Sequence, residues 1–328
     1  TMKRRSLIQA AIGLGGMGLS HARQQHSLLW RERTLTGLGT TMAIRVGHAD
    51  AALAEQALDA ARDTIRHVED HMSLYRSDSA ICQLNRTGRL HHPHPDLARI
   101  LQLAQTVAAR SHGAFDVTVQ PLWTAFQTAS SQGQLPTADA VRRARSLVDW
   151  RQLEVSDESI TLRRQGMGIT LNGIAQGFAA DLVVARLQAL GIRHALIDTG
   201  EWAALGTPEP HRDWKLGVAD PRDARAVLAR VAMDGRCMAT SADNQCSFSP
   251  DFRHHHIFDP ATGYSPSGLS CVAVLAPSCV LADALTKVMF VAGFQPSLQL
   301  AKAWNVDVLV VDKKGVWQAT AGVRLLPA

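Results

Sequence analysis

Hydrophobic and polar positions change their spacing along the chain, and the change is clearest in residues 169–200. The short β-branched run from Ile169 to Leu171 predicts a strand, and Asn172-Gly173 predicts a tight turn after it. Apolar residues then recur at the spacing of one helix face, at Phe178, Leu182, Val183, Leu187 and Leu190. Gly191 suits the left-handed position that ends a helix, and residues 195–197 predict a second strand.

The rest of the chain also shows a mixture of helical and strand patterns. Helices are expected over residues 51–71, 80–85 and 97–108 and after Thr137 and Ser278, and Asp50, Ser79 and Thr137 are suitable N-caps. Strands are expected at residues 35–46, 216–219, 227–233 and 272–275, with hairpins over 151–163 and 307–320.

The first residues have the features of an export signal. Arg4-Arg5 precedes a weakly apolar, glycine-rich stretch that is too short to span a bilayer, and small residues allow cleavage after Ala22. We therefore expect residues 1–22 to be a twin-arginine signal peptide that directs the folded protein to the periplasm. Residues 23–34 are expected to be a flexible leader, and residues 35–328 a single domain.

Composition and charge narrow the class of protein. The chain is 46% hydrophobic and 19% charged, which is typical of a globular protein with an ample core. Its net charge of +5 becomes +2 without residues 1–22, which contain three cations and no acids, and this argues against nucleic-acid binding. The five cysteines have no CxxC spacing and are expected as buried thiols, with a Cys237–Cys246 or Cys271–Cys279 bridge as the alternative.

Two polar features are candidate binding sites. A helix that starts after Asn172-Gly173 presents backbone N–H groups and a positive dipole end, which suit a pyrophosphate; an ordinary helix on a sheet is the alternative. The run from His91 to Pro95 holds three histidines, which could bind a metal. Its two prolines and its lack of helical spacing favour a surface loop.

The segment LNGIAQGFAAD, residues 171–181, resembles the central motif of the ApbE family, the FAD:protein FMN transferases. Further segments resemble the family in the same order: Thr41-Met42, residues 72–85, residues 113–122, and residues 256–264 followed by 276–293. The resemblance covers about residues 35–325. It implies an α+β fold with mixed, mostly antiparallel sheets and packed helices, in a T-fold-like architecture.

The family reaction implied by this resemblance transfers FMN from FAD to a threonine hydroxyl of a target flavoprotein and releases AMP. The positions implied for FAD binding are Met42, Tyr75, Ala114, Phe115, Asp116, Thr170, Gln176 and Ile257. Residues 114–119 would offer a strand edge to the flavin. His256 is the candidate base, because histidine titrates near neutral pH. The alternatives are a core methionine at Met42, a helix cap at Asp116 and a structural histidine at His256.

The resemblance also implies a magnesium site, and here the chain departs from the family. Gly173 matches a carbonyl ligand and Asp283 matches an aspartate ligand, but Lys287 stands where a threonine is expected. Asp283 and Lys287 lie at i and i+4, so the ammonium could stand where the metal would. Both join His256 as catalytic candidates, and magnesium is left open as a cofactor. Other departures are Thr170 for an aspartate, Gln176 for a lysine and Glu201 for a second glycine.

Three functions are compatible with these residues. The first is an exported flavin transferase. The others are a periplasmic FAD-binding or assembly protein without transfer activity, and a FAD pyrophosphatase. Residues 254–260, HHHIFDP, also resemble family members that accompany nitrous-oxide respiration. That resemblance implies a membrane-bound flavoprotein of this pathway as the target.

Overall fold

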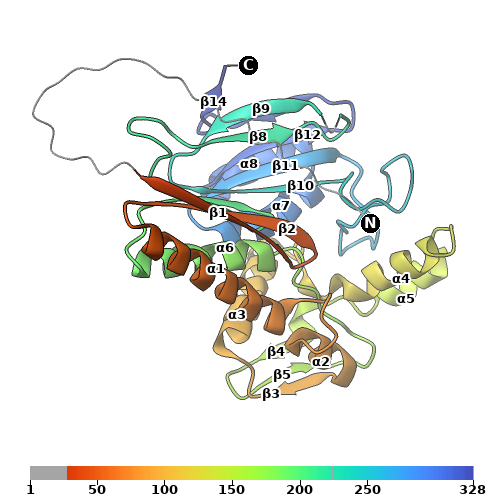
Figure 1. Cartoon of the computed structure of the whole chain (residues 1–328). Helices are drawn as coiled ribbons and strands as arrows, with labels where there is room; N and C mark the ends of the chain where they lie inside the picture. Colours follow the sequence, from red (N-terminus) through yellow and green to blue (C-terminus); the bar gives the residue numbers. More distant parts are fainter. Residues whose placement is uncertain (1–27, 224, 328) are drawn as a thin grey trace, which may run out of the picture.

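An eight-stranded antiparallel sheet lies at the centre of the molecule (Figure 1), in a computed structural model that describes residues 28–223 and 225–327. The strands, in spatial order, are β1 (Leu29–Gly37), β2 (Thr40–His48), β6 (His194–Asp198), β7 (Trp202–Leu205), β10 (Cys237–Ala242), β11 (Leu269–Ala276), β12 (Asp307–Asp312) and β13 (Trp317–Ala319). Strand β11 is buried along its whole length. Its side chains alternate between two cores, with Val272 and Val274 in one and Cys271 and Ala273 in the other.

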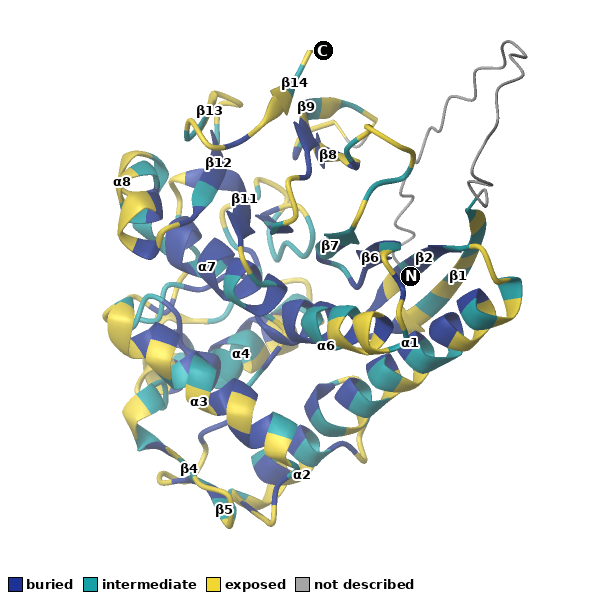
Figure 2. Cartoon of the chain, turned by 90° about the vertical axis from the view of Figure 1, so that its left-hand side faces the viewer, coloured by how far each residue is buried: buried dark blue, intermediate teal, exposed yellow. Residues whose placement is uncertain are grey.

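Helices α1 (Ala51–Met72), α6 (Ala175–Ala189) and α7 (Cys279–Ala292) line up on one side of this sheet (Figure 2). Helix α1 begins after Asp50, whose carboxylate accepts the N–H of Ala52 at 2.8 Å, as its N-cap pattern predicts. Helices α6 and α7 come very close at Gly177, where a Cβ atom would lie 2.3 Å from the carbonyl oxygen of Cys279. Helix α8 (Phe294–Trp304) packs on β12.

A small antiparallel sheet covers the other side of the large sheet. It consists of β8 (Lys215–Ala219), β9 (Val227–Ala232) and β14 (Leu325–Leu326). Its buried side chains, such as Leu216 and Val231, pack against Leu309 and Val311 of the large sheet. The second core therefore lies between two sheets, whereas the first lies between the large sheet and its helices.

The chain between α1 and α6 forms a helical part that lies below those helices and to their right in Figure 1. It contains α2 (Ala80–Thr87), α3 (Pro95–Arg110), α4 (Gln120–Ser130) and α5 (Ala138–Arg145), with short 3-10 turns at Val117–Val119 and Trp150–Gln152. A three-stranded sheet, β3 (Arg89–His91), β5 (Ser159–Leu162) and β4 (Leu153–Val155), closes it. Ser79 and Thr137 cap α2 and α5 as expected. The helices and antiparallel sheets confirm the α+β prediction.

Three local expectations were wrong. Strand β1 begins at Leu29, inside the expected leader 23–34. Its polar residues are compatible with an edge strand, because about half of its side chains face solvent. Residues 169–171 do not form a strand, although the N–H of Thr170 donates to the carbonyl of Val117 at 2.8 Å. Residues 114–119 end in a 3-10 turn rather than a strand. The expected signal peptide, residues 1–22, and the rest of the leader up to residue 27 lie outside the described residues.

The cysteines are free thiols, so neither suggested bridge forms. Cys237 instead lies beside Cys279 and Asp181, with ligand atoms of all three within 4.8 Å of one another. The carboxylate of Asp181 accepts the N–H groups of Cys279 and Val280 at 2.8 and 3.0 Å, which holds the start of α7. Among residues 28–223 and 225–327, no helix combines the length and apolar character needed to cross a membrane.

Candidate active site

A cavity lies where the helical part meets α6, α7 and the large sheet. Its empty volume is about 840 Å³, which includes the open mouth. Nine of its lining residues are predicted site residues, which are Ala114, Phe115, Asp116, Thr170, Gly173, Gln176, His256, Ile257 and Lys287. The other lining residues are Val117 and Val119 from the expected strand edge, Asn172 from the expected turn, and Trp123, Glu201, Thr240, Ser241, Gln245, Phe258 and Pro260.

Asp116 shapes one wall of the cavity by holding the backbone around it. One carboxylate oxygen accepts the N–H and hydroxyl of Thr118 at 2.8 and 2.6 Å, and the other accepts the N–H of Trp150 at 3.0 Å. Burial raises the pKa of this carboxyl, while these hydrogen bonds oppose the rise. Asp116 therefore caps the 3-10 turn, which is the alternative role given above, and its neighbours Ala114 and Phe115 complete the wall.

The start of α6 forms a second wall, but its backbone is a weaker anion site than expected. The N–H groups of Ile174 and Ala175 bond to the carbonyl of Leu171 at 3.0 and 2.7 Å. The N–H of Gly177 donates to Asp283 at 3.1 Å. These three donors already have partners, which weakens the start of α6 as an anion site.

Lys287 places a cation beside the start of α6. Its ammonium pairs with one carboxylate oxygen of Asp283 and donates to the Asp283 carbonyl at 3.1 Å. A Cβ atom on Gly173 would lie 3.1 Å from Cε of Lys287, so the lysine stem passes directly over this glycine. The three positions expected at the family's metal site are thus brought together. The lysine side chain is 18% exposed and reaches the cavity, whereas Asp283 is fully buried behind it.

These residues do not fit a magnesium ion. Magnesium needs near-octahedral oxygen coordination, usually with carboxylates that have no other cation. Here one oxygen of Asp283 is paired with an ammonium and the other accepts a backbone N–H. Thr286 offers no substitute ligand, because its hydroxyl is buried against Ser241 at 2.8 Å and donates to the Asp283 carbonyl at 2.7 Å.

Glu201 is a buried acid in the cavity wall whose role the sequence analysis missed. Its carboxyl accepts the N–H of Thr240 at 2.8 Å. Burial raises its pKa well above the usual value, the charge of Asp283 raises it further, and Lys287 opposes both. The only signal in the sequence is its departure from the family glycine, which does not reveal that two acids and a lysine share one site.

His256 lines the cavity from the loop that follows β10. Its Nδ1 lies 3.2 Å from the carbonyl oxygen of Cys246, and its backbone N–H donates to the same oxygen at 3.0 Å. A carbonyl can only accept, so this contact assigns the ring proton to Nδ1 and leaves the lone pair on Nε2. That tautomer suits a general base. Asp259 accepts the N–H of Ala261 at 2.9 Å in the next turn.

Two expected flavin contacts lie elsewhere. Met42 is fully buried in the first core and does not line the cavity, so the core role given as its alternative holds. Tyr75 is 62% exposed and packs on Gly39, and its hydroxyl accepts a hydrogen bond from Asn172 at 3.4 Å. Since Asn172 lines the cavity, Tyr75 lies at its rim rather than inside it.

Fold and site together define an α+β protein with a cavity between its helical part and its large sheet. The profile of the ApbE family matches residues 38–310, and the chain therefore belongs to the ApbE family. A FAD:protein FMN transferase of Treponema pallidum (strain Nichols) is 29% identical over 309 residues, which cover 87% of this chain and 85% of that protein.

Solved structures show the same architecture. The apo form of the Pseudomonas stutzeri flavinyl transferase ApbE aligns with a TM-score of 0.78 and 26% identity over 90% of this chain and 96% of that chain. The ApbE protein of Thermotoga maritima aligns with a TM-score of 0.82 over 89% and 97% of the two chains, and at 23% identity it bears on the fold alone.

Proposed function

We propose that this chain is a FAD:protein FMN transferase that moves FMN from FAD to a threonine hydroxyl of a target flavoprotein. One observation carries the proposal: residues from separate segments that match the family meet in one cavity. These segments run through residues 114–116, 170–176, 256–257 and 287. Curated relatives that match over most of their length, such as the Treponema pallidum protein, bear the same activity in their names.

The proposed chemistry is a phosphoryl transfer. The threonine oxygen attacks the phosphorus on the FMN side of FAD, a new P–O bond forms, and the bond to the AMP phosphate breaks with its electron pair leaving on AMP. Nε2 of His256 takes the hydroxyl proton. The ammonium of Lys287 offsets charge on the transferred phosphoryl group, as a point charge held in place by Asp283.

The test incubates purified protein with FAD and a target domain that carries the acceptor threonine. Transfer is measured as flavin fluorescence on the denatured target and as released AMP. His256→Ala should retain FAD binding and lower the transfer rate by about 10²–10⁴-fold, the usual size of a general-base effect. His91→Ala, at an exposed histidine that does not line the cavity, is the matched control and should transfer normally.

The products separate the alternatives. AMP without labelled target would indicate a FAD pyrophosphatase, and FAD binding without either product would indicate a binding or assembly protein. An undiminished rate in His256→Ala would leave the transferase proposal standing and remove His256 as its base.

We further propose that the protein works in the periplasm after export by the twin-arginine route, and that its target is a membrane flavoprotein of nitrous-oxide respiration. Arg4-Arg5 and the segment HHHIFDP at residues 254–260 support this proposal. Replacing both arginines by lysine should leave the protein in the cytoplasm. Deleting the gene should leave the target in isolated membranes without covalent flavin. Normal export of the arginine variant would contradict the export route, and normal flavinylation after gene deletion would contradict the target.

A further inference from the structure

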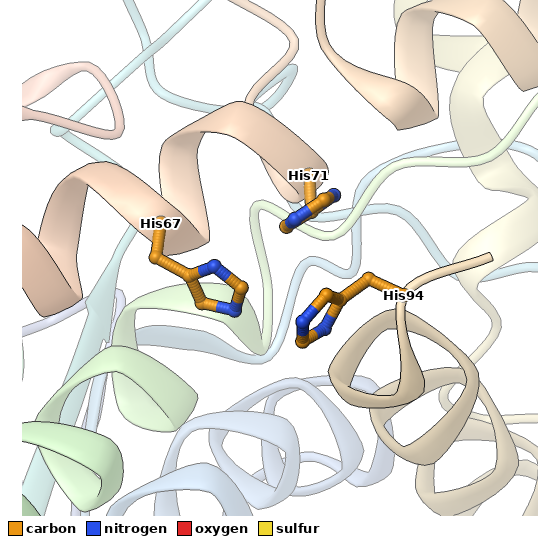
Figure 3. Close-up of side chains that lie close together, drawn as sticks. All are labelled: His67, His71 and His94. Carbon is orange, nitrogen blue, oxygen red and sulfur yellow. The ribbon is translucent and has the colours of Figure 1, made fainter.

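Three histidines, two on α1 and one just before α3, meet away from the flavin cavity (Figure 3). His67 and His71 lie at i and i+4 near the end of α1 and so share one helix face. His94 is the residue before α3. The ring centroids are 4.4 Å apart for His67 and His94, 4.7 Å for His71 and His94, and 4.8 Å for His67 and His71. Each ring presents a nitrogen, and these nitrogens all lie within 4.8 Å of one another.

A carboxylate accompanies the three rings. Oδ2 of Asp96 lies 2.9 Å from Nε2 of His67 and 3.6 Å from Nδ1 of His94. The side chains of His67, His94 and Asp96 are 32%, 39% and 24% exposed, so an ion can reach the cluster from solvent.

We propose that His67, His71 and His94 bind a divalent zinc ion, with Asp96 as the residue that positions the rings. Three imidazoles are a typical zinc ligand set, and a carboxylate that accepts the second ring N–H commonly supports such ligands. Magnesium and calcium prefer oxygen ligands and are excluded by the same chemistry. Tetrahedral zinc requires ligand nitrogens about 3.3 Å apart, given Zn–N bonds of about 2.0 Å. Zinc binding would draw the ring nitrogens closer together than the 4.8 Å within which they now lie.

The ion would add a further link between α1 and the start of α3, which the contact of His67 with Asp96 already joins. Helix α1 ends at Met72, and the loop after it carries Tyr75 at the rim of the flavin cavity. Zinc would fix this end of α1 to the start of α3, so its role is structural. None of the three histidines lines the flavin cavity, and the proposal does not depend on the proposed transferase activity.

The test is calorimetric titration of zinc into the full chain, purified without a histidine tag and stripped of metal. We expect one equivalent of zinc to bind to the wild type and to raise its melting temperature. His67→Gln/His71→Gln should lose that equivalent. His94→Asn should lose it while keeping a helix cap, because asparagine is a good N-cap residue. Asp96→Asn should bind about 10–100-fold more weakly, the usual effect of removing a supporting carboxylate.

Controls distinguish this cluster from other ligands in the chain. His91→Gln, in the same histidine-rich segment but outside the cluster, should bind zinc like the wild type. Cys237→Ser should also bind zinc like the wild type. This variant alters the second group with metal-ligand spacing among the described residues, which consists of Asp181, Cys237 and Cys279. Cobalt in place of zinc should give the visible absorption of a tetrahedral site, and that absorption should disappear in His67→Gln/His71→Gln.

The outcomes that overturn the proposal are specific. A wild-type protein with a normal circular dichroism spectrum that binds no zinc refutes it. Unchanged affinity in a folded His67→Gln/His71→Gln protein, or loss of binding in Cys237→Ser alone, places the ion elsewhere.

Discussion

Replacing Gly177 with alanine adds one methyl group at the crossing of α6 and α7. The new Cβ would lie 2.3 Å from the carbonyl oxygen of Cys279 and 2.8 Å from Cβ of Asp283. An ordinary contact begins near 3.4 Å, so the first distance is short by about 1.1 Å. A backbone carbonyl cannot rotate away as a side chain can. The two helices must therefore separate by about 1 Å at this point.

The expected destabilisation follows from three contributions. Overpacking against backbone costs about 3 kcal/mol, the upper part of the usual range. Separation of the helices also breaks the 3.1 Å bond from the Gly177 N–H to Asp283, which costs about 1.5 kcal/mol because the acceptor is charged. Alanine recovers about 1 kcal/mol through its higher helix propensity. The net loss is about 3–4 kcal/mol, which corresponds to a melting temperature lower by roughly 5–6 °C in a domain of this length.

Urea and thermal unfolding followed by circular dichroism measure this loss. Gly173→Ala is the matched control, because its Cβ would meet only the flexible Lys287 stem at 3.1 Å. It should change stability by less than about 1 kcal/mol. Gly177→Ala should also slow FMN transfer, since Asp283 moves away from the cavity. A Gly177→Ala protein as stable as the wild type would refute the close crossing and the argument built on it.

Three further predictions concern ionisable side chains. Lys287→Met should weaken FAD binding but leave riboflavin binding unchanged, as measured by fluorescence quenching. Transfer by the wild type should survive a magnesium chelator. Transfer that the chelator abolishes and magnesium restores would contradict the proposed role of Lys287. The pKa of Glu201 is raised in the folded protein. Above pH 4.5, the ordinary pKa of this carboxyl, the unfolded chain loses a proton that the folded protein keeps. The free energy of unfolding therefore falls as pH rises. The melting temperature of Glu201→Gln relative to the wild type should therefore increase between about pH 5 and about pH 8, and a constant difference would exclude the raised pKa. Burial lowers the pKa of His255 to about 3, so stability is lost as pH falls from 6.5 towards 3. His255→Asn should lose stability less steeply in acid-unfolding curves. An equally steep loss would assign the acid sensitivity to other groups.

Local patterns in the sequence predicted local structure well. Asp50, Ser79 and Thr137 cap the helices that were expected after them, because a cap depends on a side chain and on N–H groups two or three residues later. Gly191 takes the left-handed conformation expected of it, with φ of 81°. The pairing of Asp283 with Lys287 was also predictable from the i, i+4 spacing on one helix.

Features that depend on distant segments were not predictable in the same way. The β-branched run at residues 169–171 resembles a strand, but no neighbouring strand pairs with it. His94 was assigned to a surface loop, because nothing in its own segment shows that α1 brings His67 and His71 beside it. Glu201 was likewise noted only as a substitution. Its environment is created by Thr240 of β10 and Lys287 of α7, which are far away in the sequence.

The order of strands in the large sheet has a consequence for how the chain folds. Strand β2 pairs with β1 across a short turn, but its other edge pairs with β6, where Ala43 lies opposite Asp198. The whole helical part intervenes, so this edge of β2 remains unpaired until about 150 residues of chain have been ordered or synthesised. Such distant pairing slows folding, and an unpaired edge promotes association between chains. Low yields of soluble protein at high expression rates are therefore to be expected, and slower synthesis should improve them.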